Sequence, residues 1–222
     1  MRQGNEDKIT EILRKIAPGT PIRNGLENIL KARTGALLFF TDNEEIIKEI
    51  VDGGFNINEP YTSSKLYELA KMDGAIVIST DMQKILFANA ELIPSSEIPT
   101  VETGTRHRTA ERTAKQTGEL VISISQRRNI ITIFKDNERY ILEDTEVVLN
   151  KANQAIQTLE KYRKVFDSKL NILNEYEFND IVTLENVLGV IQRAEMVMQI
   201  VEEIEKQIAE LGEDRKTCRY AT

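Results

Sequence analysis

Two patterns of hydrophobic and polar positions divide the chain near residue 143. Before that point, short apolar runs alternate with polar turns, a pattern typical of buried strands interspersed with helices. After it, apolar residues recur every three or four positions over long stretches, as they do in amphipathic helices. The sequence therefore predicts two domains, residues 1–142 and residues 143–222.

The first domain is predicted to contain a β-sheet with helices packed on it. Apolar runs predict strands at residues 36–41, 75–79, 84–88, 119–125, 130–135 and 139–142. Helices are expected at residues 20–33, 44–51, 63–71 and 106–116, with Thr20-Pro21 starting the first and Ser63 or Ser64 capping the third. The fold class that follows is α/β, a central mixed β-sheet flanked by helices.

The second domain is predicted to be all helical. Its apolar stripes run through residues 152–173 and 184–211, with a connection near residues 174–180. Two long amphipathic helices of this kind form an antiparallel pair, which can pack on itself, on the first domain or on another subunit. We expect a helical spine that follows the sheet domain.

The charge of the chain separates the same two parts. The net charge is −7, and residues 143–222, with 16 acidic and 10 basic residues, contribute −6 of it. This acidic excess argues against a basic nucleic-acid tail. Apolar runs are too short to span a bilayer and no secretion signal opens the chain, so a cytoplasmic location is expected. The single cysteine, Cys218, excludes an intramolecular disulfide.

A basic segment interrupts this acidic chain. Residues 106–116 hold four basic residues against one acidic residue. Thr105 is expected to cap a helix that begins at Arg106, whose free N–H groups and positive dipole end attract an anion. The guanidinium groups of Arg106 and Arg108 match phosphate oxygens. Gly104 lets the backbone approach a ligand closely. The hydroxyls of Thr105 and Thr109 add neutral hydrogen-bond donors. The segment favours a polyphosphate site, and a solvated basic helix face is the alternative.

A carboxylate lies where a predicted helix meets a buried strand. Asp73 and Gly74 directly precede the strand that begins at Ala75. A carboxylate next to a buried strand costs free energy unless it has a partner, and Mg²⁺ is a suitable one. Gly74 and Ala75 leave room for a base or a ribose. A plain Asp-Gly turn is the alternative interpretation.

Three further residues are weaker candidates. Leu92 lies in a predicted loop, where it can cover a flat base or join the core. Ser125, with Gln126-Arg127-Arg128 after it, ends a strand and can donate to phosphates or simply form an exposed turn. His107 stands between two arginines, which disfavour the imidazolium of a catalytic triad. The motifs of P-loop, Rossmann and hydrolase enzymes do not occur in the sequence.

Taken together, two segments resemble a known family. Asp73-Gly74-Ala75 and Gly104-Thr105-Arg106-His107-Arg108 are similar to the paired DGA and RHR signatures of the diadenylate cyclase (DAC) domain family. The resemblance extends over residues 8–212 to the DNA-integrity scanning (DisA) members of that family. The stretches that carry it are residues 17–21, 51–55, 66–72, 109–112 and 151–156.

The resemblance implies a nucleotidyltransferase that condenses two ATP into cyclic di-AMP and two pyrophosphates, with Mg²⁺ or Mn²⁺. It implies that Asp73 holds the metal and helps to activate the ribose 3′-hydroxyl. It further implies that Arg106, His107 and Arg108 act on the phosphates, with His107 as a phosphate or metal contact. The implied adenosine contacts are Gly74, Ala75 and Leu92, and the implied phosphate contacts are Gly104, Thr105, Arg106, His107, Arg108, Thr109 and Ser125.

The symmetry of the product implies an assembly. Each ATP must present its 3′-hydroxyl to the α-phosphate of the other, so two sites should face each other across a two-fold axis. The family implies a homo-oligomer, with octamers expected. Its DNA-scanning members continue into helix-hairpin-helix modules that bind branched DNA, and this chain ends at Thr222 before such a module, so DNA binding by this chain is not expected.

Two other functions stay open at this stage. One is a DNA-integrity scanning protein whose main role is the recognition of branched DNA, and the other is a non-catalytic scaffold that binds ATP. The last ten residues lose the apolar stripe and the family resemblance, which suggests a truncation or a shifted reading frame just after Gly212.

Overall fold

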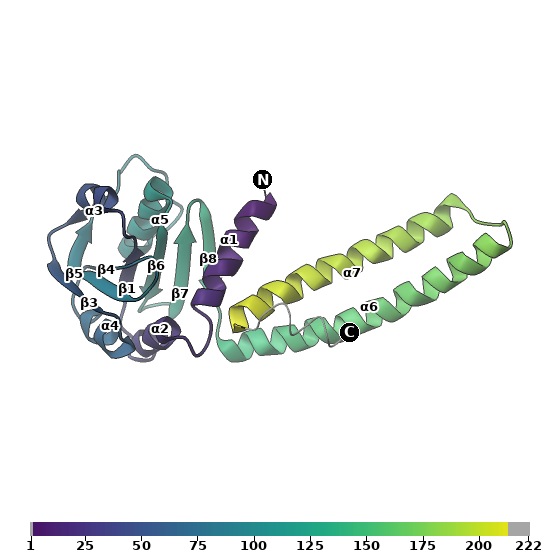
Figure 1. The fold of residues 1–222 in the computed structure, drawn as a ribbon, viewed down its shortest axis with the longest axis horizontal. Coiled ribbons are helices and arrows are strands. Elements are labelled where there is room, and N and C mark those ends of the chain that lie inside the picture. The colour runs from purple at the N-terminus through teal and green to yellow at the C-terminus, as the bar shows by residue number, and fades with distance from the viewer. Residues whose placement is uncertain (1, 213–222) are drawn as a thin grey trace. The chain divides into compact units, whose positions relative to one another are not determined.

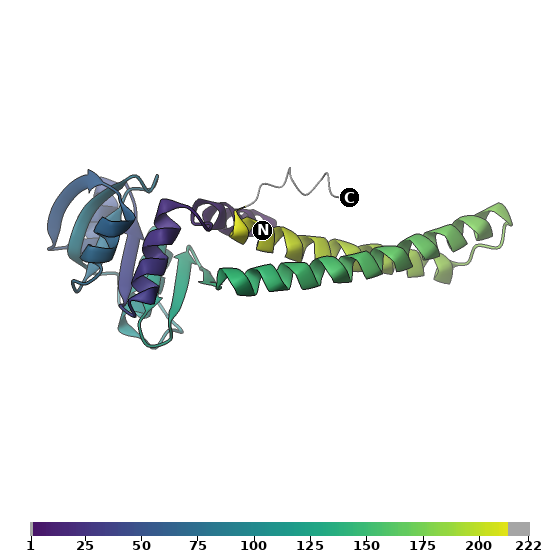
Figure 2. The same ribbon diagram turned by 90° about the horizontal axis from the view of Figure 1, so that it is seen from below.

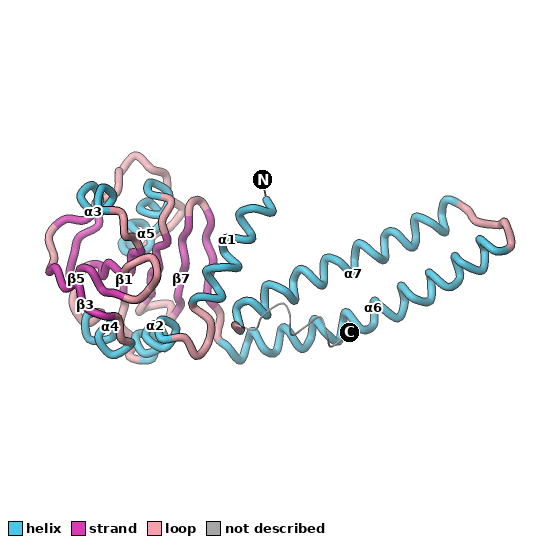
Figure 3. Tube along the Cα trace, viewed as in Figure 1, coloured by secondary structure: helices cyan, strands magenta, loops and turns pink. Residues whose placement is uncertain are grey.

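The computed structural model describes residues 2–212, with side chains from residue 9 onward, and the chain divides into two compact units, Met1–Glu143 and Asp144–Thr222. The first unit combines helices and strands (Figures 1 and 3). Its elements are α1 (Arg2–Lys15), α2 (Pro21–Lys31), β1 (Ala36–Phe40), α3 (Glu44–Ile50), β2 (Val51–Asp52), β3 (Phe55–Pro60), α4 (Ser63–Leu69), β4 (Ala75–Ile78), β5 (Lys84–Leu92), α5 (Thr105–Thr117), β6 (Leu120–Ser125), β7 (Ile130–Lys135) and β8 (Glu138–Leu142).

The strands form one mixed sheet. Its order is β2-β5-β4-β1-β6-β7-β8, and β3 pairs with β5 beside this path. Strands β1 and β4 run parallel, and the other pairings of the described strands are antiparallel. The expected fold class, a central mixed sheet with flanking helices followed by long helices, is confirmed.

Each face of the sheet carries its own core and its own helices. Because side chains alternate along a strand, Leu38 and Phe40 of β1 pack into one core while Leu37 and Phe39 pack into the other. The first core includes residues of α1, α2 and α4, and the second includes residues of α3 and α5 (Figure 1). Helix α5 contacts β1, β6 and β7 on the second face, which fixes where its N-terminus lies.

Most of the predicted strands and helices are present, and the differences have physical causes. Strand β3 was not predicted because its residues are almost all exposed and half of them are polar, and among the described strands it pairs with β5 alone. Strand β5 continues to Leu92, so the predicted loop at that residue is wrong. Helix α1 and the short strand β2 were not predicted either.

Two helix starts differ from the expected capping residues. Thr62, not Ser63 or Ser64, caps α4 by accepting the Lys65 N–H, while the Ser63 hydroxyl donates to the Pro21 carbonyl. Gly104, not Thr105, is the N-cap of α5, and Thr105 is already its first helical residue. The expected cap at Thr20 is confirmed, since its side chain accepts the Arg23 N–H.

The second unit is a helical hairpin. Helices α6 (Thr145–Phe178) and α7 (Leu184–Leu211) contact each other along their lengths and run antiparallel (Figure 2). Their connection spans residues 179–183, not 174–180, because α6 continues to Phe178. A capping box of Thr183 and Asn186 starts α7. Cys218 lies outside the described residues, and none of the described helices is long and apolar enough to cross a membrane.

Candidate active site

A cavity of about 820 Å³ opens in the first unit where four segments meet. These segments are the α2–β1 turn, the α4–β4 turn, the start of α5, and the end of β6 with the turn after it. The lining residues are Arg33, Asp73, Gly74, Gly104, Thr105, Arg106, His107, Ile124, Ser125, Gln126 and Arg127. The cavity therefore brings together the two segments that the sequence singled out.

The α4–β4 turn presents Asp73 to this cavity. The Asp73 side chain is fully exposed. Gly74 beside it has φ +96°, and a Cβ there would stand 2.8 Å from the Ala90 carbonyl oxygen. Only glycine adopts this conformation in this space without strain. The turn thus brings the carboxylate to the mouth of the cavity while Ala75, which is buried, starts the strand behind it.

The side chain of Arg106 reaches across to Asp73. Its Nη2 lies 3.5 Å from Oδ1 of Asp73, and the Arg106 side chain is 39% exposed. An ion pair this open to water contributes little free energy, because solvent screens it. Both groups are therefore free to exchange this contact for a stronger one with a ligand.

The start of α5 provides unused donors at the same place. Gly104 is its N-cap and makes no side-chain capping hydrogen bond. The first helical hydrogen bond runs from the Arg108 N–H to the Gly104 carbonyl, at 2.8 Å. The N–H groups of the first turn, with the positive end of the helix dipole, thus lie beside the cavity and suit an anion.

His107 faces the sheet. It is 7% exposed, its Nδ1 lies 3.1 Å from the Ser123 hydroxyl, and its Nε2 lies 3.3 Å from the Thr132 hydroxyl. The ring meets Phe134 edge-on, with the centroids 6.2 Å apart. Both ring nitrogens therefore have hydroxyl partners from the sheet. Sequence reasoning missed Ser123 and Thr132, although a hydroxyl inside an otherwise apolar strand signals a buried polar partner.

The surroundings of His107 favour its neutral form. Burial lowers the pKa of His107 below its ordinary value of 6.5. Glu102 acts against this shift, and the positive charges of Arg128 and Arg139 reinforce it. A neutral ring bonded to two hydroxyls anchors α5 to β6 and β7.

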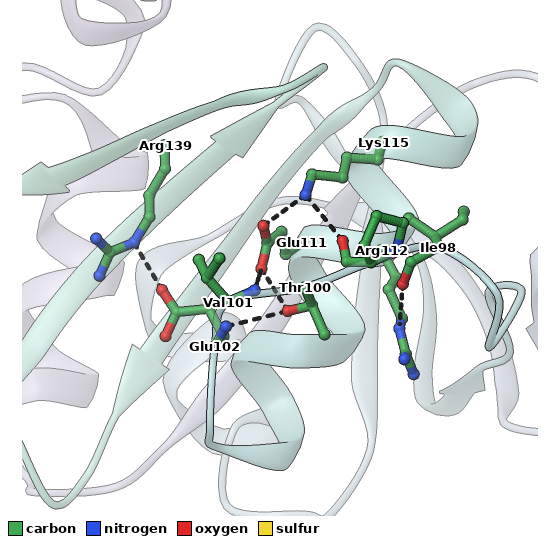
Figure 4. A network of polar contacts seen from close by, with 9 residues as sticks. Ile98, Thr100, Val101, Glu102, Glu111, Arg112, Lys115 and Arg139 are labelled. Atoms are coloured by element: carbon green, nitrogen blue, oxygen red, sulfur yellow. Dashed lines mark hydrogen bonds and ion pairs between the residues drawn. The ribbon is translucent and has the colours of Figure 1, made fainter.

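A buried carboxylate ties the β5–α5 loop, residues 93–104, to α5 (Figure 4). Glu111 accepts hydrogen bonds from the Thr100 hydroxyl, from the Val101 N–H at 3.2 Å and from Nζ of Lys115 at 2.7 Å. Burial by itself raises the pKa of Glu111, but these donors outweigh it and hold the pKa below its ordinary value. The carboxylate stays ionised and holds the loop that leads into Gly104.

Two basic residues of α5 bind this loop rather than the cavity. Nε of Arg112 donates to the Ile98 carbonyl at 2.9 Å, and Nζ of Lys115 donates to the Pro99 carbonyl at 2.9 Å (Figure 4). Two of the four basic residues that suggested an anion site therefore stabilise the fold. Arg106 is the basic residue of α5 that lines the cavity.

Four of the candidate residues lie away from the cavity lining. Ala75 and Leu92 are buried, Leu92 at 7% exposure, and both pack in the core beneath α3 and α5. Arg108 is exposed and Thr109 is half-buried on other faces of α5. Conversely, the lining includes Arg33, which the sequence did not single out.

The cavity can hold a divalent cation through one protein ligand. Among the described residues no group of three or more His, Cys, Asp or Glu side chains lies close enough to hold a metal. Asp73 is the carboxylate on the described lining. A single carboxylate suits Mg²⁺ or Mn²⁺ that takes its other ligands from water and substrate phosphates, because Mg²⁺ keeps much of its hydration shell. The donor set fits that mode of binding.

Comparison with known proteins gives the family. Residues 23–139, which include the whole cavity lining, match the model of the DAC family, described as DisA bacterial checkpoint controller nucleotide-binding. The chain belongs to the DAC family. Residues 142–220 match the DisA bacterial checkpoint controller linker region, so the resemblance read from the sequence is confirmed. That match runs past Gly212, so the expected end of the resemblance there is wrong.

Curated DAC-family relatives are close in sequence. The DNA integrity scanning protein DisA of Clostridium botulinum (strain 657) is 60% identical over 214 residues, which is 96% of this chain and 60% of that protein. The protein of the same name from Clostridium tetani is 57% identical over 216 residues, or 97% of this chain and 60% of that protein. The chain thus spans about 60% of the length of these relatives.

A solved structure of DacA from Staphylococcus aureus is also similar. It is 22% identical, with a TM-score of 0.45, and the match covers 65% of this chain and 92% of that chain.

Proposed function

We propose that this chain is a diadenylate cyclase that converts two ATP into cyclic di-AMP and two pyrophosphates. The observation that carries the proposal is the meeting of Asp73, Arg106 and the uncapped start of α5 at one cavity. A carboxylate for a metal beside cationic and N–H donors for phosphates is what nucleotidyl transfer needs. Membership in a nucleotide-binding family supports the same conclusion.

The reaction forms two phosphodiester bonds. The 3′-oxygen of each ATP attacks the α-phosphorus of the other, and a new P–O bond forms as the bond from the α-phosphorus to the bridging oxygen breaks. Pyrophosphate leaves with the electron pair of that bond, and the hydroxyl proton passes to solvent or to a carboxylate. Two such transfers close the ring and release two pyrophosphates, so no further reactant is needed.

Asp73 would hold Mg²⁺ or Mn²⁺ in this proposal. When bound, such an ion neutralises charge on the α-phosphate and lowers the pKa of a coordinated hydroxyl. The Asp73 carboxylate would be able to exchange its contact with Arg106 for such an ion, because the exposed pair contributes little free energy. In the same proposal, the Asp73 carboxylate would help to take the proton from the ribose 3′-hydroxyl.

The residues around α5 would hold the phosphates. Arg106 and the N–H groups of the first turn face the cavity, as do the backbone of Gly104 and the hydroxyl of Thr105. Ser125 shapes the opposite wall, since its hydroxyl accepts the Arg128 N–H at 3.1 Å and fixes the turn that carries Arg127. His107 orients this group of donors through its bonds to the sheet. Positioning of this kind supplies much of the rate of phosphoryl transfer.

The proposal includes a homo-oligomer. The product is symmetric, so two cavities must face each other across a two-fold axis. Arg108 is exposed outside the cavity lining of its own chain, and we assign it to the nucleotide of the facing chain. The longer relatives are named for DNA integrity scanning, and we assign catalysis to the residues described here.

Replacement of Asp73 tests the assignment directly. Asp73→Asn should lower cyclic di-AMP formation by about 10²-fold or more, because charge stabilisation worth several kcal/mol is lost. Asp52→Asn, at an exposed carboxylate on β2, is the matched control and should retain full turnover. Product is measured by chromatography with mass detection. Equal turnover in the two variants would remove Asp73 from the proposed site.

A further inference from the structure

A glycine lies directly against the guanidinium group of Arg106. Gly35, the residue before β1, is buried. A Cβ built on Gly35 would overlap Nη1 of Arg106 and would stand 3.3 Å from its Cζ. The Ile124 carbonyl oxygen, from β6, would lie 3.2 Å from the same Cβ. The guanidinium therefore occupies the volume that any other side chain at position 35 would need.

Little else fixes the end of the Arg106 side chain. Its ion pair with Asp73 is 3.5 Å long and open to solvent, and such pairs hold a side chain weakly. An arginine side chain has several rotatable bonds, so its position depends on the shape of the surface beneath it. That surface is the backbone of Gly35, which lies behind the guanidinium of the cavity-lining Arg106.

We propose that Gly35 is a positioning residue that sets where the Arg106 guanidinium lies in the cavity. This inference rests on the proposed function, in which Arg106 binds the phosphates of ATP. A methyl group at position 35 leaves the charge of Arg106 intact and displaces its end, while the Ile124 carbonyl, 3.2 Å from the new Cβ, needs only a small shift. Displacement of a phosphate-binding group by about 1 Å reduces nucleotidyl transfer by up to ~10²-fold.

A double-mutant cycle separates this role from a general packing effect. The four proteins are the unmodified chain, Gly35→Ala, Arg106→Ala and the combination of both. The probe is 3′-deoxy-ATP with Mg²⁺, which lacks the attacking hydroxyl and so reports binding without turnover. Affinity is measured by isothermal titration calorimetry, and the thermal midpoint of each protein is recorded. Gly189→Ala is the control, because a Cβ at Gly189 meets no atom within 4 Å.

Gly35→Ala should weaken binding of the probe by about 10-fold or more in the unmodified background, as expected for a misplaced phosphate contact. The same change should alter binding by less than about twofold when Arg106 is already alanine, because the two substitutions act on one contact. If Gly35→Ala alone fails to fold, recovery of folding in the combined variant supports the same contact.

Other outcomes overturn the inference. Equal losses from Gly35→Ala in both backgrounds, or unchanged affinity in the single variant, would show that Gly35 does not act through Arg106. Failure of both Gly35 variants to fold would assign Gly35 to the core alone. Absence of probe binding to the unmodified chain, with binding also absent in the Gly189→Ala control, would overturn the proposed function and this inference with it.

Discussion

Helical geometry decides which residues of the Arg106-His107-Arg108 motif reach the cavity. Successive residues of an α-helix point about 100° apart, so three adjacent residues cannot share one face. Arg106 and His107 both line the cavity, with the His107 ring bonded to the sheet behind it, and Arg108 is exposed elsewhere. Residue types that suit a phosphate could be recognised in the sequence, but the direction of each side chain depends on how α5 lies on β6 and β7.

The burial of His107 makes stability depend on pH. Its pKa is lowered in the folded protein, so below about pH 6.5 the unfolded chain takes up a proton that the folded protein does not. The stabilisation by neutral His107 is complete above this pH and is lost as the pH falls through it. His107 is the only histidine of the chain, so few other groups titrate there.

We expect the free energy of unfolding to fall between pH 7.5 and pH 5.5, by at most about 1 kcal/mol. His107→Gln retains an amide that can bond to the two hydroxyls and removes the titrating group, so its stability should change little over this range. Urea unfolding at several pH values measures the effect. The same pH dependence in His107→Gln would refute this account of His107.

Contacts between the β5–α5 loop and helix α5 position the candidate site. Its hydrogen bonds with Glu111, Arg112 and Lys115 fix the chain that enters α5 at Gly104 (Figure 4). The apolar strands were predictable because each carries its own hydrophobic signal. The loop contacts were not predictable, since most of them join side chains of α5 to backbone groups of the loop 10 to 16 positions away. Charged residues with the same spacing also occur on solvated helix faces.

Removal of the Thr100 hydroxyl should weaken this connection. Thr100→Val takes a donor from the buried Glu111 carboxylate and should lower the free energy of unfolding by about 1–3 kcal/mol. Thr100→Ser keeps the hydroxyl and should stay close to the unmodified protein. Glu97→Gln, at an exposed residue of the same loop, is the control in urea unfolding. Equal stability of Thr100→Val and Glu97→Gln would contradict this role.

At the scale of the whole molecule, a symmetric product requires more than one chain. The described helical hairpin leaves several large apolar side chains exposed, among them Phe178 at 91% and Leu184 at 75%. Contiguous exposed apolar surface is typical of association. The division of the chain into a mixed part and a helical part was predictable from its hydrophobic periodicity. The number of chains in an assembly was not, because it depends on the fit between surfaces, which hydrophobic periodicity does not show.

Turnover should therefore depend on protein concentration. Dilution of the chain below the dissociation constant of its dimer should lower the specific rate of cyclic di-AMP formation, because facing sites separate. Binding of 3′-deoxy-ATP should persist at the same dilution and lose only the contact with Arg108 of the facing chain, since the cavity itself lies within one chain. Both are measured over a dilution series, with size-exclusion light scattering to follow the mass. A constant specific rate for a monomer would contradict the two-fold site.

The most direct test of the central claim is incubation of the purified chain with ATP and Mg²⁺ or Mn²⁺, followed by chromatography with mass detection. The account predicts cyclic di-AMP with two pyrophosphates released for each molecule formed. Tight binding of ATP with neither product nor pyrophosphate would contradict it and would make this chain a nucleotide-binding scaffold.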